Sequence, residues 1–353
     1  MEILSLDLTN FRNFSAQKIA FSKNLTVIIG ANGSGKSNIL EAVSLLSGIK
    51  SSRVETDLDL IKFGKTEAKI EGTLDVSKLT INFQVVDETL RGSPQDSGQA
   101  GQAFVRKAYF VDSIKKRLLD FVDHFSIIEF SPFDLDLVVG SPSLRRHHLD
   151  ILLSGLDRDY WRAISSYNKV VVRRNKVLLR ILEHQAKPSE LDFWDERLIE
   201  HGVIVSRVRQ DFFEYLNFVE KKDYSWELKQ SLVTAEKLAK NRERDISAGV
   251  TLSGPHRDDF QFLFRERNLE YFGSRGEQRM AVLALKLAEL EYFAFKKGVR
   301  PVLALDDIFS ELDWEHREAV LSVIGKQQTI ITAAEPESLP KEIFKKAKVV
   351  ELR

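Results

Sequence analysis

GANGSGKS occupies residues 30–37 and matches the phosphate-binding loop pattern G-x-x-x-x-G-K-[ST]. The run before it, Leu25–Ile29 (LTVII), is β-branched and typical of a buried parallel strand. After the loop, apolar residues recur at helical spacing until Gly48, which is placed to end a helix. Because this pattern needs a glycine turn between a strand and a helix, we predict a nucleotide site and not a chance match.

The residues of this loop suit phosphate chemistry. Glycines let backbone N–H groups curl around an anion at the positive end of the following helix. Lys36 is expected to reach the β and γ phosphates, and Ser37 to offer its hydroxyl to Mg²⁺. The loop therefore predicts both a nucleotide and a metal ion.

A second motif supports this prediction. Val302–Asp307 (VLALDD) is an apolar run that ends in two acids. In an ATPase with a phosphate loop, Asp306 would hold Mg²⁺ and Asp307 would orient or deprotonate the attacking water. The alternative is a strand followed by an acidic helix cap. Thr329–Thr332 (TIIT) predicts a further buried strand, and Ser310–Asp313 (SELD) a polar turn.

Composition limits the classes of function. The chain has 353 residues, enough for about two or three lobes, and 43% of them are hydrophobic. Lysine plus arginine and aspartate plus glutamate each number 52, so any DNA contact must come from a local patch. Zero cysteines suit a reducing cytosol. With no apolar run near twenty residues and no basic-then-apolar leader, we expect a cytoplasmic protein without membrane contact.

The amino-terminal part predicts antiparallel strands. Residues 2–10 alternate apolar and polar side chains, as do residues 68–87 and 104–111. Between the latter two, residues 91–103 are rich in Gly, Ser and Gln and predict a mobile surface loop. A turn with the sequence NFRNF, residues 10–14, precedes the phosphate loop. Arg12 in this turn either lies over the nucleotide or is a solvated arginine packed by its stem, and the spacing leaves both readings open.

The middle of the chain predicts a helical lobe. Ser141 and Pro142 form a helix start, and residues 144–241 read almost entirely as helix. Two long apolar stripes, separated by Pro188, predict an antiparallel hairpin. The first comprises Trp161, Ile164, Asn168, Val171, Leu178 and Leu182, and the second Leu198, Val205, Val208, Phe212 and Leu216. The basic residues of the lobe are either solvated or in contact with DNA phosphates or a partner. They are the pair Arg145 and Arg146 and the tract Arg173, Arg174, Lys176 and Arg180.

Two later stretches resemble the LSGGQ signature turn of ABC-type ATPases: residues 252–259 (LSGPHRDD) and residues 272–279 (FGSRGEQR). The signature must open a helix whose N-terminus can face a γ-phosphate. The first stretch leads into an alternating pattern at Phe260, Phe262 and Phe264, which predicts a strand. Because the second leads into a long helical pattern, we choose it as the signature.

The order of these motifs resembles the RecF family over nearly the whole chain. The motifs that carry the resemblance are NFRNF, GANGSGKS, FSPFDL with GSPSLRR, GPHRDD, SRGEQR and LALDDIFSELD. The resemblance implies that ATP is bound by the loop, Mg²⁺ by Ser37 and Asp306, and that Asp307 activates water. It also implies that Ser274, Gly276 and Gln278 contact ATP held by a second subunit. The loop residues are Gly30, Ala31, Asn32, Gly33, Ser34, Gly35, Lys36 and Ser37.

The resemblance also implies a function. RecF proteins dimerise around two ATP molecules, bind DNA in that state, and with RecO and RecR help to place RecA at gapped DNA during repair and replication restart. An Asp follows the metal acid where ABC proteins carry Glu, no His follows TIIT, and no convincing glutamine loop is present. The Asp and the missing His imply slow hydrolysis, which suits a timing switch.

The implied fold is α/β, an ABC/SMC-like ATPase head with a mixed sheet and an inserted helical lobe. We expect the head at residues 1–140 and 246–353 and the lobe at residues 141–245. The alternative is a transporter ATPase subunit or another SMC-like ATPase not dedicated to recombination. A transporter subunit would be expected to have a glutamine loop, a switch His and a shorter insert. A chromosome-scale SMC arm would need hundreds of heptad residues.

Overall fold

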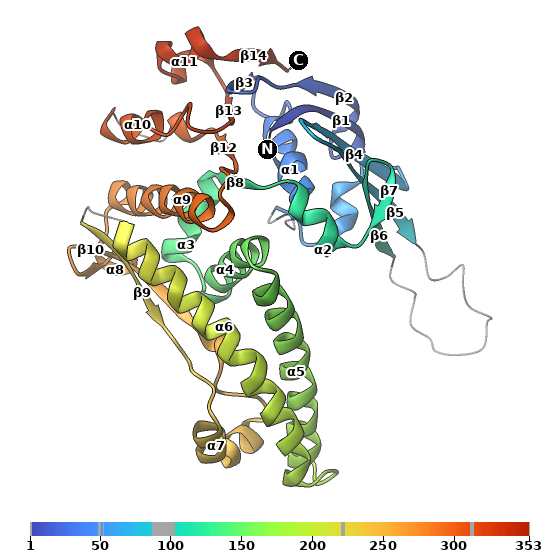
Figure 1. Ribbon diagram of the computed structural model, residues 1–353, viewed down its shortest axis with the longest axis vertical. Helices are drawn as coiled ribbons and strands as arrows, with labels where there is room; N and C mark the ends of the chain where they lie inside the picture. Colours follow the sequence, from blue (N-terminus) through green and yellow to red (C-terminus); the bar gives the residue numbers. More distant parts are fainter. Residues whose placement is uncertain are drawn as a thin grey trace. The chain divides into compact units, whose positions relative to one another are not determined.

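The computed structural model describes residues 2–48, 51, 53–86, 103–219, 223–310 and 314–352. The chain forms two compact units, unit 1 with Met1–Pro132 and Gly298–Arg353, and unit 2 with Phe133–Lys297 (Figure 1). Residues 246–297 therefore belong to the same unit as the helical hairpin, whereas the expected boundaries stood at residues 140 and 245. The loop predicted at residues 91–103 lies almost entirely outside the described residues, as does most of the SELD turn.

A five-stranded parallel sheet positions the phosphate loop in unit 1. Its strand order is β14-β3-β13-β12-β8. The predicted strand Leu25–Ile29 is confirmed as β3, and both VLALD and TIIT form strands of the same sheet. TIIT lies beside β3, and VLALD lies beside TIIT. Apart from the half-buried Ile29, the apolar residues of these three strands are buried, as expected of parallel strands covered on both faces. The other strands are β8 (Ile127–Phe130), β12 (Val302–Asp306), β13 (Thr329–Ala333) and β14 (Lys348–Glu351).

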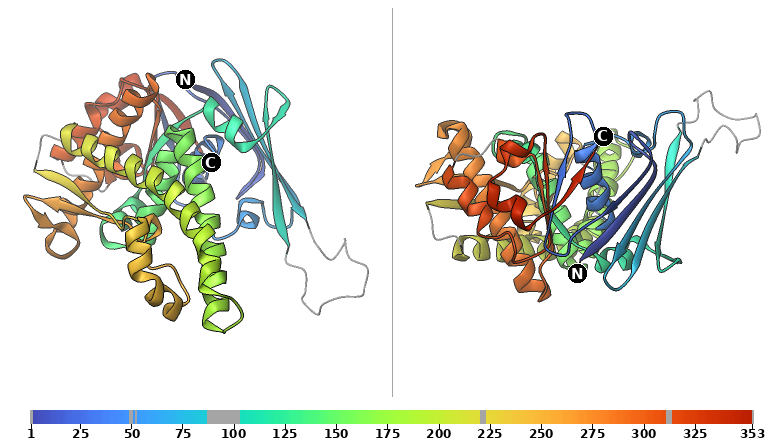
Figure 2. Two further views of the ribbon diagram at one scale, coloured as in Figure 1. Left: turned by 60° about the horizontal axis from the view of Figure 1, so that its bottom comes forward. Right: turned by 90° about the horizontal axis from the view of Figure 1, so that it is seen from above.

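A six-stranded antiparallel sheet completes unit 1, in the order β2-β1-β4-β5-β6-β7. Helix α1 (Lys36–Leu46) contacts strands of both sheets, and its apolar side chains join one core cluster with theirs (Figure 2). The alternating strands predicted at residues 2–10, 68–87 and 104–111 are confirmed. The six strands of the sheet are β1 (Ile3–Phe11), β2 (Phe14–Ala20), β4 (Glu67–Leu74), β5 (Lys78–Val86), β6 (Phe104–Val111) and β7 (Ile114–Lys116). The smaller helices are α2 (Leu118–Phe121), α10 (Trp314–Leu321) and α11 (Lys341–Lys346).

Unit 2 is built on the predicted antiparallel helical hairpin. Helix α5 (Arg158–Leu182) packs along α6 (Asp192–Val219), and Pro188 lies in the turn between them (Figure 1). Helix α4 begins at Pro142 after Ser141, as predicted. The remaining helices are α3 (Asp136–Val139), α4 (Pro142–Leu156), α7 (Ala235–Ala248), α8 (Leu269–Phe272) and α9 (Arg275–Lys297). No helix in the described part of the chain is long and apolar enough to cross a membrane.

The prediction of nearly continuous helix up to Asn241 is wrong at Tyr224–Lys229, which form strand β9. This strand pairs with β10 (Asp259–Phe264), and β10 pairs with β11 (Arg267–Asn268). Trp226 lies opposite Phe262 and both side chains are buried. The strand therefore owes its conformation to a partner more than thirty residues away, which local periodicity does not register.

The predicted apolar stripe of α5 is shifted by about one residue. Ile164 and Leu178 are buried as expected, but Trp161 and Val171 are only half-buried, while their neighbours Tyr160 and Val170 lie in the core. Arg174 also lies on the buried face of α5. A search for helical periodicity that counts only apolar residues places every basic residue on the solvent side, so it misses Arg174. The stripe of α6 is confirmed at Leu198, Val205, Val208, Phe212 and Leu216.

Candidate nucleotide site

The phosphate loop lies between β3 and α1 and depends on its glycines. Gly33 and Gly35 have φ values of 84° and 102°, in the left-handed region that favours glycine. At Gly35 a Cβ atom would also lie 2.4 Å from the ring of Phe14. The loop can therefore close against α1 only with glycine at this position.

Lys36 begins α1 and turns its side chain back over the loop. Its Nζ donates to the carbonyl oxygens of Gly30, at 2.7 Å, and Ala31, at 3.1 Å. The lysine is 7% exposed, so its ammonium is held at the loop and not in bulk solvent. This arrangement sets one positive charge beside the N–H groups that would receive a phosphate.

The predicted metal-binding residues lie together. The Ser37 hydroxyl donates to Asp306 Oδ1 at 3.0 Å, although the two residues are 269 positions apart. Thr332 Oγ1 donates to the same carboxylate oxygen at 2.6 Å, because β12 and β13 place Asp306 opposite Thr332. A hydroxyl and a carboxylate are the ligands that Mg²⁺ takes from a protein when nucleotide phosphates supply others, so these residues fit Mg²⁺.

Sequence reasoning missed Arg53, which pairs with the same aspartate. One of its nitrogens donates to Asp306 Oδ2 at 2.6 Å and to Glu129 Oε1 at 3.3 Å. Burial favours the neutral form of this guanidinium, but the charge and hydrogen bond of Asp306 and the charge of Glu129 outweigh it and raise the pKa of Arg53. The residue lies in a polar stretch with no pattern, so only the fold identifies it.

Asp307 follows β12 in a strained conformation. Its φ of 51° is in the left-handed region, which is rare for a residue other than glycine. The backbone N–H donates to Thr332 Oγ1 at 3.0 Å, and the carbonyl accepts from Ser310 Oγ at 2.7 Å. Thr332 thus contacts both aspartates, a role that the sequence did not suggest.

The NFRNF turn, residues 10–14, makes hydrogen bonds to the phosphate loop and to α1. Asn13 donates to the Ser34 carbonyl at 3.3 Å and accepts from Asn38 at 2.9 Å. Arg12 makes two hydrogen bonds to the Glu41 carboxylate on α1, at 2.7 and 2.8 Å. The Arg12 guanidinium is therefore ion-paired with Glu41 and is not a solvated turn arginine. Its contact with the nucleotide stays a prediction.

A cavity of about 520 Å³ adjoins this turn, a volume within the usual range of small-ligand sites. Its lining includes Arg12, Asn13, Asn38, Lys62 and Phe63. Asn38 is only one residue from Ser37, so the cavity is next to the start of α1. No sequence motif predicts this cavity, since its lining residues come from four separate segments.

The chosen signature opens a helix, as predicted. Helix α9 begins at Arg275, and Ser274 and Glu277 form a reciprocal cap in which each backbone N–H donates to the other side chain. Hydrogen bonding from Ser274 lowers the pKa of Glu277. Ser274 and Gly276 are exposed, but Gln278 is only 6% exposed and donates to the Leu269 carbonyl at 2.8 Å. Gln278 would have to leave this bond to reach a ligand.

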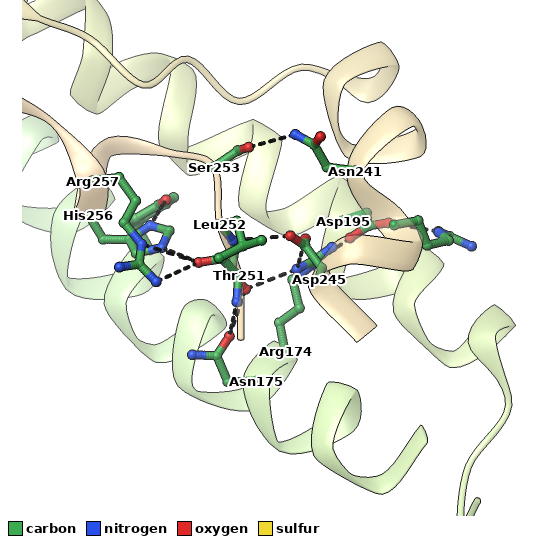
Figure 3. Close-up of polar contacts among 12 residues, drawn as sticks. Arg174, Asn175, Asp195, Asn241, Asp245, Thr251, Leu252, Ser253, His256 and Arg257 are labelled. Carbon is green, nitrogen blue, oxygen red and sulfur yellow. Dashed lines mark hydrogen bonds and ion pairs between the residues drawn. The ribbon is translucent and has the colours of Figure 1, made fainter. Parts of the chain in front are cut away.

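The rejected stretch, LSGPHRDD, does not open a long helix but passes through a short turn into β10. Ser253 is buried and accepts from Asn241 at 3.0 Å (Figure 3). His256 donates to the Thr251 carbonyl at 3.0 Å and accepts from the Tyr167 hydroxyl at 2.7 Å. The stretch therefore has a structural role inside unit 2.

Arg145 is not solvated and Arg146 is half-buried, and both arginines bind the end of this same stretch. Arg145 is buried and binds Asp259 at 2.6 and 3.0 Å. Arg146 donates to the Asp258 carbonyl at 2.9 Å. The alternatives considered from sequence, a solvated face or a DNA contact, are both wrong for Arg145, because its charge is used to join α4 to β10.

The parallel sheet, the phosphate loop, the Ser37–Asp306 pair and a separate helix that opens at Ser274 define an ATPase head of the ABC/SMC class. The sequence profile of the RecF/RecN/SMC N terminal domain matches residues 2–350. The chain is 32% identical to the DNA replication and repair protein RecF of Moorella thermoacetica over 370 residues, which covers 100% of this chain and 95% of that protein. The chain belongs to the RecF family.

A second relative and a solved structure support the same family assignment. The RecF protein of Bacillus cytotoxicus is 32% identical over 380 residues, with 100% of this chain and 97% of that protein covered. Among solved structures, the recombination mediator protein RecF bound to ATP in the RecFOR pathway superposes with a TM-score of 0.82 at 29% identity. That comparison covers 96% of this chain and 93% of the other.

Proposed function

We propose that this chain is an ATP-dependent DNA-binding recombination mediator. The observation that carries the proposal is the convergence of Lys36, Ser37 and Asp306 at one loop, in a chain that matches RecF proteins over its whole length. A solved relative is described as RecF-ATP in the RecFOR pathway, which supports ATP as the nucleotide. The general alternative of a transporter ATPase subunit finds no support among these relatives.

In this proposal the loop residues 30–37 bind ATP, and Lys36 neutralises its terminal phosphates. Ser37 and Asp306 hold Mg²⁺, and Asp307 orients or deprotonates the attacking water. Since Arg53 is paired with Asp306, that contact must rearrange when the ion enters. Arg12 and Asn38 wall the cavity beside the loop, which we assign to the nucleoside part of ATP.

We further propose that two ATP molecules join two copies of the chain. The exposed helix start at Ser274 and Gly276 would meet the γ-phosphate held by the second copy, and Gln278 would join after leaving Leu269. The dimer would bind gapped duplex DNA and act with RecO and RecR to place RecA, in the cytoplasm. Asp307 in place of Glu, and Ala333 and Ala334 where a switch His would stand, favour slow hydrolysis that times release.

Mass measurement by light scattering tests this proposal. We expect a monomer without nucleotide or with ADP, and a dimer with ATP and Mg²⁺, which gapped duplex DNA should stabilise. A mass that is unchanged by ATP, with and without DNA, would contradict the ATP-dependent dimer. ATP-dependent dimers whose stability does not change with DNA would instead favour an SMC-like ATPase not dedicated to recombination.

A further inference from the structure

Helix α5 carries a row of cations on its exposed side. Between Tyr160 and Leu182 the sequence contains six basic residues and no acid, although acids and bases are equally frequent in the whole chain. One of the six, Arg174, is buried. The other five and Arg158 at the start of the helix are exposed, and we call these six residues the basic stripe. They are Arg158, Arg162, Lys169, Arg173, Lys176 and Arg180.

The helix geometry gathers the basic stripe into a narrow band. Successive residues turn by about 100°, so these six positions fall within an arc of about 60° around the axis. With a rise of about 1.5 Å per residue, the row from Arg158 to Arg180 is about 33 Å long. The opposite side of the helix, with Tyr167, Val170 and Ile181, is buried in unit 2.

Arg174 shows why the row must be defined by structure and not by sequence adjacency. Its guanidinium donates to Asp195 at 2.7 Å, to Asp245 at 2.8 Å and to the Thr251 hydroxyl at 2.9 Å (Figure 3). The prediction that Arg174 takes part in a DNA-binding tract is therefore wrong. Arg173, one residue earlier, is exposed on the basic stripe.

Weak pairing and exposure leave charge of the basic stripe available to a partner. Arg162 pairs with Asp159 and Arg180 with Glu190, both at 3.3–3.4 Å and in exposed positions where such pairs are weak. Within the described ranges, Lys169, Arg173 and Lys176 have no acidic partner. A solvated helix face normally mixes both signs of charge, whereas Asp159 is the single acid in the sequence from Arg158 to Arg180.

We propose that the basic stripe binds the phosphate backbone of duplex DNA. This inference rests on the proposed function, since it locates the DNA surface of the same protein. A linear row of like charges complements a polymer that carries a negative charge at every step, and it needs no base-specific groups. An anionic membrane is the less suitable partner, because interfacial helices insert an apolar face and that face of α5 is packed against α6.

Salt dependence of binding tests the inference directly. The full-length chain with ATP and Mg²⁺ is titrated with gapped duplex DNA over a series of salt concentrations. The test variant is Lys169→Gln, Arg173→Gln and Lys176→Gln together. Its charge-matched control replaces three exposed lysines of α11, Lys341→Gln, Lys345→Gln and Lys346→Gln. Thermal unfolding of both variants establishes that the fold is intact.

We expect the magnitude of the negative slope of log K against log salt to fall by up to about 2.7 in the test variant, at about 0.9 per lost phosphate contact, and to keep the parent value in the control. Exchanging the cations, as Lys169→Arg, Arg173→Lys and Lys176→Arg, should preserve the slope, because phosphates require charge and not one side-chain shape. Loss of slope in this exchange variant would contradict backbone binding.

Failure of the assignment of the basic stripe and failure of the proposed function give different results. If the parent binds DNA and the test variant keeps its slope, the basic stripe is not the DNA surface, while the proposed function stands. If the parent shows no DNA binding, the proposed function fails and the assignment of the stripe falls with it. Binding to vesicles of phosphatidylserine in place of DNA would overturn the inference in favour of a membrane.

Discussion

Two clusters of arginine and aspartate, one in each unit, look alike in composition but differ in burial. In unit 1, Arg53 pairs with Asp306, and its side chain keeps 15% of its exposure. In unit 2, Arg174 pairs with Asp195 and Asp245 and is not exposed at all. The first cluster surrounds a group expected to bind a metal ion, and the second joins α5, α6 and α7. The difference teaches that an ion pair at a binding site must be exchangeable for a ligand, whereas an ion pair in a core has only to neutralise its buried charges.

The largest expected effect is in unit 2. Arg174→Ala leaves the carboxylates of Asp195 and Asp245 without their buried cation, and it should lower the free energy of unfolding by about 3–5 kcal/mol. Denaturant titration measures it. Arg173→Ala is the matched control, since this neighbour is exposed and should change stability by less than about 0.5 kcal/mol. Equal losses in the two variants would remove the distinction between core and surface arginines.

The next effect is on ligand binding in unit 1. Lys36→Ala removes the charge held over the phosphate loop and should weaken ATP binding by a few kcal/mol, about 100-fold or more. Calorimetric titration with ATP and Mg²⁺ measures the affinity, and Lys326→Ala, an exposed lysine elsewhere in unit 1, serves as control. Unchanged affinity in Lys36→Ala would contradict the assignment of the loop.

His256 tests how strongly the core of unit 2 excludes charge. Burial, together with the positive charges of Arg257, Arg146 and Arg174, lowers its pKa from 6.5 to about 4. Since the folded-state pKa lies below the unfolded value, the contribution to stability is fully present above pH 6.5 and is lost as the pH falls towards 4. Between pH 7.5 and 5 the loss should be about 2 kcal/mol.

The measurement compares unfolding free energies of the parent and His256→Gln at both pH values. The variant should lack this component of the pH dependence, whatever other groups contribute. Identical pH profiles would mean that His256 accepts a proton in the folded state at no cost, and that the core of unit 2 is open to water.

Arg53→Ala should have a smaller effect on stability than Arg174→Ala. Asp306 and Glu129 keep hydrogen bonds from Thr332 and Ser44, so the loss should be roughly 1 kcal/mol, well below that of Arg174→Ala. Mg²⁺ with ATP should restore part of this stability, because an ion at Asp306 replaces the missing charge. A loss as large as that of Arg174→Ala in a denaturant titration would place Arg53 in a rigid core and contradict its exchange with a metal ion.

The sequence predicted the parts of this molecule that local pattern determines. The loop, β3, α1 and the helix after Ser274 each follow from residues within about twenty positions of one another. The Ser37–Asp306 contact was also anticipated, because the two motifs are recognisable separately and the chemistry of Mg²⁺ joins them. Two recognisable motifs can therefore predict a contact between residues that are 269 positions apart in the sequence.

The remainder depends on contacts that local pattern does not encode. Strand β9 exists because β10 pairs with it, and Arg53 reaches Asp306 from a stretch without periodicity. Arg174 was grouped with Arg173 because both are basic, yet one turns towards two buried acids and the other towards solvent. Such residues are placed by distant partners, so composition and spacing cannot separate them.

The central claim is that the exposed N-terminus of α9 at Ser274 in one copy contacts the ATP bound by another copy. Ser274→Arg sets a bulky positive charge at the positive end of α9, and it should leave ATP binding to the monomer intact while preventing the dimer. Ser247→Arg, on an exposed face of α7, is the matched control and should dimerise as the parent does.

The most direct measurement is the mass of a mixture of Ser274→Arg and Lys36→Ala with ATP and Mg²⁺. In a mixed dimer, one composite site carries both substitutions and the other pairs an intact loop with an intact signature. We predict that each variant alone stays a monomer and that the mixture recovers part of the dimer. A Ser274→Arg protein that dimerises with ATP as fully as the parent would contradict the account.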